Sequence, residues 1–431
     1  MSQTQYDRRL WISRANQQSG EMSLPEPGRQ AANRGVATEQ LRRHNLSAVL
    51  ECLHLSGPRS RSELAAQTGL NRSTIRDLIG LLVELGLVSE DSGTTSGGPG
   101  RPSAVAQTTP AGAVAISVDL QVDYTALATI GLGGHIFGRV RVANPPGPYT
   151  PEDIVAELER LTPRVTAQLP PRHTLVGVGA AVAGVVRRDD GFLHVSPNHG
   201  WSDVPLGSMI AAALGVDRVL MANEADAGAL AEQRRGAARG VRHLIHVSGE
   251  VGVGIGIIHN GRPMLGTAGY AGEAGHNVVN PAGRSCKCGS TGCWETEVGE
   301  EALARHAGIP EAAGRQGAID TILRRAHSGD PEVFAAFRAV GSWLGLGVGN
   351  LINTFNPELV TFGGFYHEFY PFLEGPINDG AQRAAMSAPW DACTITRGKL
   401  GLDARLIGAA ELVFSQVIAN PSRLQVSGAR G

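Results

Sequence analysis

Apolar residues recur at helical spacing after the first 37 residues. Between Glu39 and Leu55 they fall at i, i+3, i+4 and i+7, the stripe of an amphipathic helix, and the same period returns from Asn71 onward. The two stripes consist of Leu46, Val49, Leu50 and Leu53, and of Ile75, Leu78, Ile79 and Leu82. Residues 1–37 have no such period and are rich in Gln, Ser, Arg and Pro, so we expect a disordered tail there.

A shorter helix is predicted between these two. Ser60 and Glu63 have the spacing of a capping box, and Gly69 is a residue type that commonly ends a helix. Helix, short helix, glycine turn and helix is the order of a helix-turn-helix. A strand is predicted to start at Leu87, and the Gly/Ser/Thr/Pro-rich run 92–103 is typical of a flexible wing and linker. We therefore predict a winged helix-turn-helix with its wing and linker over residues 38–105.

Beyond residue 105 the pattern changes to strands that alternate with helices. Two strand–turn–strand units are predicted, over 113–130 and 243–258, and helical and strand-like segments follow each of them. This order predicts an α/β domain over residues 106–431, built from two related lobes with a cleft between them.

Composition and charge narrow the class of protein. A net charge of -2 implies no overall attraction to nucleic acid or to an anionic membrane. Residues 1–105 hold 12 Arg against 10 acidic residues, whereas the remainder holds 26 basic and 30 acidic residues, so only a local DNA-binding surface is plausible. No apolar run has the length of a membrane span or the place of a signal-peptide core, so we expect a cytoplasmic protein without membrane contact.

Three of the five cysteines lie within eight residues. Cys286, Cys288 and Cys293 follow His276 with the spacing H-x9-C-x-C-x4-C, which in a reducing cytosol indicates metal ligands sooner than disulfides. One imidazole and three thiolates form the closed tetrahedral shell of a structural Zn²⁺ site, with no position left for catalytic water. Three glycines let the backbone fold tightly around the ion: Gly283, Gly289 and Gly292. The alternative is a set of free buried thiols.

Two carboxylates flank these ligands. Glu273 and Glu295 could accept hydrogen bonds from the vicinal hydroxyls of a sugar held beside a fixed His276. The alternative is that both carboxylates are simply solvated.

At these residues the chain resembles the ROK family of repressors, open reading frames and sugar kinases, over about residues 38–420. The most specific elements are Gly-Glu-Ala-Gly-His at 272–276 and Cys-x-Cys-Gly-x-x-Gly-Cys-x-Glu at 286–295. Further elements occur in the family's order: 196–201, 223–225, the glycine run 249–256, and 362–364.

The resemblance implies a fold and a set of ligand-binding residues. The fold is the two-lobed hexokinase/actin-like one, and His276 would both ligate zinc and approach a sugar. Zinc would then fix the imidazole and its neighbours before the sugar arrives, which lowers the ordering cost of binding. The residues implied to surround the sugar are Asn198, Asn223, Glu224, Glu273, His276 and Glu295.

The chain departs from the family's kinases at the phosphate loop. Those kinases have Asp-x-Gly-Gly-Thr, whereas residues Asp119–Asp123 read Asp-Leu-Gln-Val-Asp, which puts side chains and a carboxylate where phosphate would sit. Glu224 replaces the Asp that serves as the kinase base. The glycine loop at 249–254 is retained in outline, and we favour a tight hairpin over a nucleotide contact there. Family kinases generally lack an N-terminal domain such as this one.

We therefore expect a sugar-responsive DNA-binding transcription regulator, a repressor of carbohydrate metabolism genes, and not an enzyme. One alternative is a ROK sugar kinase that phosphorylates a hexose with ATP. Another is a DNA-binding protein whose sugar site has lost its ligand. The expected partners are double-stranded operator DNA, a sugar or sugar-derivative effector, and further copies of the chain in a homodimer or homotetramer.

Candidate DNA contacts lie at the start of the third helix and in the wing. Ser73, Thr74 and Arg76 are predicted to reach base edges in the major groove, and Arg72 a phosphate. Arg101 is predicted to enter a narrow minor groove. The alternatives are a solvated helix face and a plain linker.

Overall fold

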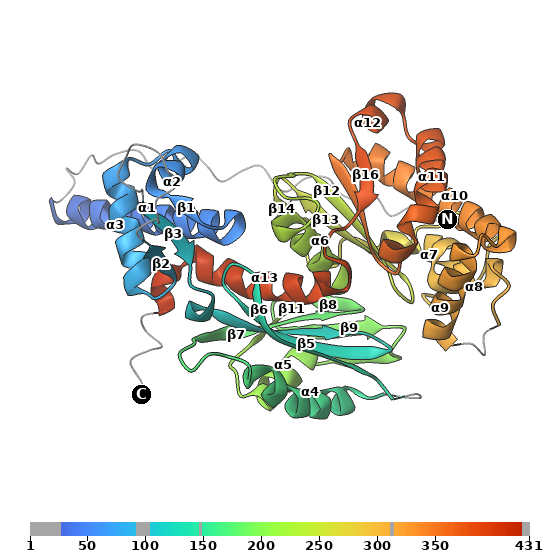
Figure 1. The fold of residues 1–431 in the computed structure, drawn as a ribbon, viewed down its shortest axis with the longest axis horizontal. Coiled ribbons are helices and arrows are strands. Elements are labelled where there is room, and N and C mark those ends of the chain that lie inside the picture. Colours follow the sequence, from blue (N-terminus) through green and yellow to red (C-terminus); the bar gives the residue numbers. More distant parts are fainter. Residues whose placement is uncertain (1–26, 92–103, 146–148, 311–313, 425–431) are drawn as a thin grey trace, which may run out of the picture.

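The computed structural model describes residues 27–91, 104–145, 149–310 and 314–424. They form an N-terminal head, at one end of the molecule, and a larger body of two lobes (Figure 1). In these segments no helix combines the length and the apolar character that crossing a membrane requires.

The head has the predicted order of helices. These are α1 (Pro27–Ser56), α2 (Arg61–Thr68) and α3 (Arg72–Glu84). A small sheet packs with them and has the spatial order β1 (Arg59–Ser60), β3 (Val105–Thr108), β2 (Val88–Asp91); β1 lies between α1 and α2 in the chain. β2 and β3 pair antiparallel and are the two strands of a wing. The winged helix-turn-helix is therefore confirmed. Arg101 and the rest of the predicted wing loop at 92–103 lie outside the described residues, as do residues 1–26 of the predicted tail.

Short-range chemistry sets the ends of the head's helices. The Ser60 side chain accepts the Glu63 N–H while the Glu63 carboxylate accepts the Ser60 N–H, as the predicted capping box requires. Gly69 ends α2 with a φ of 72°, and the Asn71 side chain begins α3 by accepting the Thr74 N–H. The apolar stripe of α3 is buried: Ile75, Leu78, Ile79 and Leu82.

Two boundaries differ from the prediction. α1 begins at Pro27 and not near Glu39. β3 continues to Thr108, past the boundary predicted at residue 105, because its backbone pairs with β1 and β2.

The two lobes are built on sheets of the same topology. The first sheet has the order β11-β7-β4-β5-β6, and the second has the order β16-β15-β12-β13-β14. In each sheet the first three strands are parallel to one another, and each of the last two strands is antiparallel to the strand before it in this order. The first consists of β4 (Val114–Leu120), β5 (Tyr124–Gly131), β6 (His135–Ala143), β7 (Leu175–Val182) and β11 (Val219–Asn223). The second consists of β12 (Leu244–Gly249), β13 (Val253–His259), β14 (Arg262–Pro263), β15 (Leu359–Gly364) and β16 (Thr394–Arg397). Two related α/β lobes are therefore confirmed.

Helices cover both faces of these sheets. On the first lobe α4 (Pro151–Thr166) and α5 (Leu206–Leu214) lie opposite α13 (Ala404–Ala419), and a small sheet of β8 (Val185–Arg187), β9 (Phe192–Ser196) and β10 (Trp201–Val204) adjoins them. On the second lobe α6 (Glu224–Arg235) packs against β12 and β13. The remaining helices of that lobe are α7 (Trp294–Val298), α8 (Glu300–His306), α9 (Gly314–His327), α10 (Pro331–Phe355), α11 (Tyr366–Ala384) and α12 (Ser387–Asp391).

α6 and α13 pack against each other between the two sheets. A Cβ on Gly408 of α13 would lie 1.9 Å from the carbonyl oxygen of Ala227 in α6. On another side of α6, a Cβ on Gly256 of β13 would lie 2.2 Å from the carbonyl oxygen of Ala225. Only glycine permits such backbone-to-backbone contact, so α6 is closely packed on two sides.

The head sits on the body through α1 and α13. Leu50 of α1 and Phe414 of α13 belong to one apolar core. Beside it, His54 Nε2 lies 3.0 Å from Glu411 Oε2, and Arg235 Nε donates to Glu411 Oε1 at 2.6 Å. Burial alone would raise the pKa of Glu411, but its contacts with His54 and Arg235 lower it to about 2. Head and body are thus joined by a core and by a buried ionic cluster.

The α3 core should tolerate truncation poorly. Leu82 is fully buried and its neighbour Val83 is 43% exposed. We expect Leu82→Ala to lower the local free energy of opening by about 2–5 kcal/mol and Val83→Ala by less than about 1 kcal/mol. Hydrogen exchange of the α3 amides measures this, because a protein of several domains need not unfold in one step. Equal effects of the two substitutions would contradict the core assignment.

Candidate functional site

The four predicted metal ligands converge. The ligand atoms of His276, Cys286, Cys288 and Cys293 all lie within 4.8 Å of one another. His276 Nδ1 is 3.6 Å from Cys286 Sγ, and the Sγ atoms of Cys288 and Cys293 are 3.6 Å apart. Tetrahedral zinc with bonds of about 2.0–2.3 Å separates its ligands by roughly 3.5–3.8 Å. The cluster could therefore hold a metal ion, and its donor types and these two 3.6 Å separations fit zinc.

Glycines shape the loop that carries the cysteines. Gly289 has a φ of 93° and Gly292 a φ of 74°, in the left-handed region that strains other residues. A Cβ on Gly292 would also lie 1.6 Å from the Asn280 carbonyl oxygen. The Cys286 N–H donates to the Ser290 carbonyl at 2.8 Å and closes the turn. The loop geometry thus requires the glycines that the sequence places there.

A cavity of about 570 Å³ lies between the lobes beside this cluster, within the size range of small-molecule sites. The first lobe contributes the turn after β9 and the β11–α6 junction. The second contributes the β12–β13 turn, the 3₁₀ turn Glu273–His276 and α7. All six side chains implied to surround a sugar line this cavity: Asn198, Asn223, Glu224, Glu273, His276 and Glu295.

Two carboxylates connect the metal cluster to the cavity. Glu295 Oε1 lies 2.9 Å from Cys286 Sγ and 3.4 Å from His276 Nδ1. Glu273 Oε2 lies 3.9 Å from His276 Nε2, and burial raises the pKa of Glu273. Groups that contact metal ligands help to orient them. A metal ion held by His276 and Cys286 would in turn fix these two cavity-lining side chains.

Glu224 is a buried acid that faces the cavity from the start of α6. Asn223 holds the junction, because its side-chain oxygen accepts the Ala225 N–H and its Nδ2 donates to the Gly184 carbonyl at 3.0 Å. Burial, followed by the charge of Glu250, raises the pKa of Glu224 to about 8. Within the described chain, Glu224 Oε2 has no hydrogen-bond partner, so this buried oxygen is available to a ligand.

The cavity also contains polar side chains that were not predicted to bind ligand, namely Gln121, Glu250 and Lys287. Lys287 Nζ donates to Asn198 Oδ1 at 3.4 Å and thereby joins the cysteine loop of the second lobe to the first lobe. The position of Lys287 between two predicted metal ligands was the signal that could have identified it.

Ion pairs cross from the first lobe to the second next to the cavity. Arg405, only 2% exposed, donates from Nε to Asp119 Oδ2 at 3.2 Å and also pairs with Glu250. Arg315 places one terminal nitrogen 3.2 Å from Asp123 Oδ1 and the other 3.6 Å from Glu250 Oε2. This network was not predicted from the sequence. An arginine at the start of the mostly apolar α13 was the available signal, since such a charge needs a buried partner.

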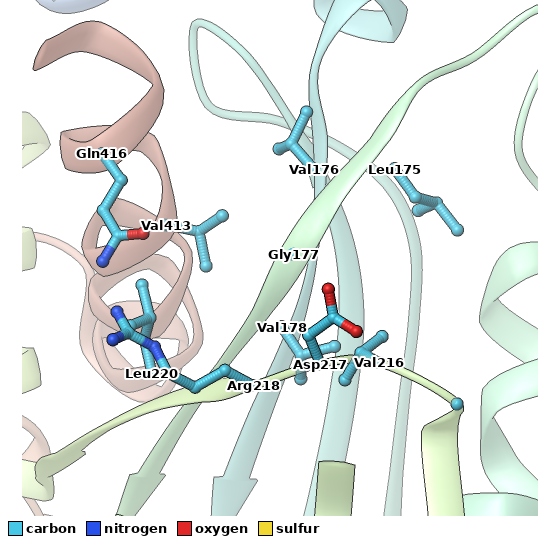
Figure 2. A pocket seen from close by; sticks show the side chains of 11 residues that line it. Leu175, Val176, Gly177, Val178, Val216, Asp217, Arg218, Leu220, Val413 and Gln416 are labelled. Atoms are coloured by element: carbon cyan, nitrogen blue, oxygen red, sulfur yellow. The ribbon is translucent and has the colours of Figure 1, made fainter. Parts of the chain in front are cut away.

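A second cavity, of about 360 Å³, lies on the first lobe between α13 and strands β7 and β11 (Figure 2). Its polar side chains are Asp217, Arg218 and Gln416, and most of the remaining lining is aliphatic. No predicted ligand-binding side chain lines it. The cavity between the lobes is therefore the candidate sugar site.

The start of α3 presents the residues predicted to contact DNA. Arg72, Ser73 and Arg76 are exposed and Thr74 is half-buried. Asn71 Oδ1 accepts hydrogen bonds from Ser73 Oγ at 2.7 Å and from the Thr74 N–H at 2.9 Å, which fixes the first turn. These four side chains share one helix end, and their contacts to DNA remain a prediction.

Two family models match the chain. The ROK family model matches residues 115–416, and the IclR helix-turn-helix domain model matches residues 45–92. The chain belongs to the ROK family, with a helix-turn-helix DNA-binding head in front of a two-lobed sugar kinase/actin-like body.

Similar regulators match a larger share of this chain than a similar kinase does. The xylose repressor of Bacillus subtilis (strain 168) is 29% identical over 375 residues, which cover 87% of this chain and 96% of the repressor. The crystal structure of a ROK family transcriptional regulator, a homologue of the E. coli MLC protein, covers 88% of this chain and 97% of its own, with a TM-score of 0.71 and 26% identity. A ROK family glucokinase from Streptomyces griseus, in complex with glucose and AMPPNP, covers 70% of this chain and 99% of its own, with a TM-score of 0.62 and 30% identity. The chain is a DNA-binding regulator of this family that resembles xylose repressors.

Loss of one thiol should empty the metal cluster. We expect Cys288→Ser to lower metal affinity at least tenfold, because three ligands replace four around the ion. Cys393→Ser is the matched control, since Cys393 is not a member of the cluster. Metal content after dialysis measures the effect. Stoichiometric metal in purified Cys288→Ser protein would contradict the assignment.

Buried Glu224 should make the protein less stable as pH rises. The folded protein holds a proton on Glu224 up to about pH 8, whereas the unfolded chain releases it near pH 4.5, so the free energy of unfolding falls as pH rises between these values. Each pKa unit corresponds to about 1.4 kcal/mol. We expect Glu224→Gln to reduce the fall in stability between about pH 5 and pH 8. Glu159→Gln, at an exposed position of α4, should leave that fall unchanged. Identical pH profiles for all three proteins would refute the assigned ionisation.

Proposed function

We propose that this chain is a sugar-responsive transcriptional repressor of carbohydrate metabolism genes. A sugar or sugar derivative binds between the lobes, and its binding releases the head from operator DNA. The observation that carries the proposal is the presence, in one molecule, of an exposed helix-turn-helix and a carboxylate-lined cavity. The wall of this cavity adjoins four side chains that could hold a metal ion.

Hydrogen-bonding chemistry supports a polyhydroxylated ligand. Carboxylates such as Glu273 and Glu295 accept hydrogen bonds from vicinal hydroxyls, and an amide such as Asn198 both accepts and donates them. Among the described residues, buried Glu224 has a carboxyl oxygen without a hydrogen-bond partner. A site built on such groups rejects ligands that leave them unpaired. The likeness to a xylose repressor makes xylose the first sugar to test.

Internal contacts engage the carboxylates of residues 119–123, which by the family resemblance correspond to a kinase phosphate loop, and this supports a non-enzymatic role. Asp119 is fully buried and is bound by Gln121 Nε2 at 2.8 Å and by Arg405. Asp123 is engaged by Arg315. The side chains of this loop therefore pair with one another and with the two arginines, and the added carboxylate of Asp123 repels phosphate.

A structural zinc ion in the His276–Cys293 cluster would support the cavity wall. Its four protein ligands leave no coordination position for water, so zinc would order His276, Glu273 and Glu295 without taking part in chemistry. The same proposal places the protein in the cytoplasm, where thiolates stay reduced, and as a homodimer or homotetramer on two operator half-sites.

The direct test is binding of the purified protein to its own upstream DNA, with and without a panel of simple sugars, at one fixed salt concentration. We expect specific binding that one sugar weakens.

Two substitutions should separate operator binding from sugar binding. Arg76→Ala should weaken operator binding about fivefold or more while sugar binding stays intact. Glu273→Gln should abolish the sugar effect while operator binding stays intact.

Other outcomes identify the alternatives. ATP-dependent phosphorylation of a hexose, without specific DNA binding, would establish a ROK sugar kinase. Specific DNA binding, with no sugar-induced thermal shift for any sugar tested, would indicate a regulator whose cavity has lost its ligand.

A further inference from the structure

α6 runs from the candidate sugar site to the DNA-binding head. Its first residue, Glu224, lines the cavity, and its last residue, Arg235, contacts the end of α1. Twelve residues of helix span about 18 Å. Residues 224–232 are all buried, so α6 is enclosed along most of its length.

Arg235 joins groups from three other elements. Its Nε donates to Glu411 of α13 at 2.6 Å, and one terminal nitrogen donates to the Gly133 carbonyl of the β5–β6 turn at 2.8 Å. The other terminal nitrogen lies 2.5 Å from His54 Nε2 of α1. His54 Nδ1 accepts the Gly133 N–H at 3.0 Å, which ties the head to the same turn. We call Arg235, Glu411 and His54 the junction cluster.

The junction cluster is far more enclosed than its neighbour. The side chains of His54, Glu411 and Arg235 are 0%, 2% and 14% exposed. Removing one partner from a buried ionic cluster is costly, because the remaining charge stays desolvated. The adjacent pair between Arg234 and Glu51, which also joins α6 to α1, is 21% and 44% exposed and is screened by water.

Close packing makes α6 move as a unit. The carbonyl of Ala225 packs against Gly256, and the carbonyl of Ala227 packs against Gly408. A Cβ on Gly228 would lie 2.6 Å from the His246 ring. These contacts leave no side-chain freedom that could absorb a shift locally. A displacement at the cavity end therefore reaches Arg235.

We propose that Arg235 is a positioning residue for the sugar response. When a sugar engages Glu224, α6 shifts, and Arg235 passes that shift through Glu411 and His54 to α1. Because α1 packs directly on α3, the recognition helix is reoriented. This inference rests on the proposed function, since it requires that a sugar binds the cavity and changes operator affinity.

The experiment measures three quantities in the full-length, metal-loaded protein: sugar affinity by calorimetry, operator affinity without sugar, and operator affinity at saturating sugar. The sugar is the one identified with the panel described above. For Arg235→Ala and Glu411→Gln we expect sugar affinity within threefold of the unsubstituted protein. The ratio of the two operator affinities, at least about 5 in the unsubstituted protein, should fall below about 2. Arg234→Ala is the matched control and should keep the ratio within twofold of the unsubstituted value.

A ratio unchanged in both junction variants overturns the inference and leaves the proposed function standing. A ratio lost equally in Arg234→Ala also overturns it, because any contact between α6 and α1 would then suffice. If the unsubstituted protein binds no sugar, the proposed function fails and this inference fails with it. Should Arg235→Ala not fold, as judged by circular dichroism and metal content, Glu411→Gln carries the test because it keeps the volume of the side chain.

Discussion

The backbone contact between α6 and α13 is the constraint on which the rest of the structure depends. Gly408 and Gly256 let α6 lie between the two sheets at distances that no other residue type permits. The start of α6 then places Glu224 in the cavity, and α13 carries Arg405 to one side and Glu411 to the head. A single pair of helices thus positions the ligand site, the lobe-bridging ion pairs and the docking surface of the DNA-binding head.

Buried charges mark the places where parts of the molecule meet. Arg405 and Arg315 link the lobes, and the junction cluster links the body to the head. Such groups add little net stability compared with apolar packing, but they define one arrangement of partners and penalise others. That property suits a protein whose parts must change their relative positions in a defined way.

Local patterns in the sequence predicted much of this structure. The capping box at Ser60 and the apolar stripe of α3 depend on residues close in the chain, and both have the predicted geometry. The cysteine spacing is also local, and its residues lie close enough together with His276 to hold a metal ion. The six implied sugar-binding residues line one cavity because β11, α6 and the cysteine loop converge. That convergence was expected only from the family resemblance.

Other features depend on contacts between distant parts of the chain. The partners of Arg405 and Glu411 lie 286 and 357 residues away in sequence, at Asp119 and His54. The start of α1 was missed for a different reason, since its first residues form helix without an apolar face. The period of apolar residues indicates which face of a helix or strand is buried. It does not indicate which distant residues pack against that face.

If sugar binding and operator binding are coupled within one molecule, each must change the other by the same factor. The decisive measurement is therefore calorimetric titration of the effector sugar into the free protein and into the protein saturated with its operator, at identical salt. We expect sugar affinity to be weaker on the operator, by the factor with which the sugar weakens DNA binding. Equal sugar affinities in the two titrations would contradict a sugar-responsive repressor.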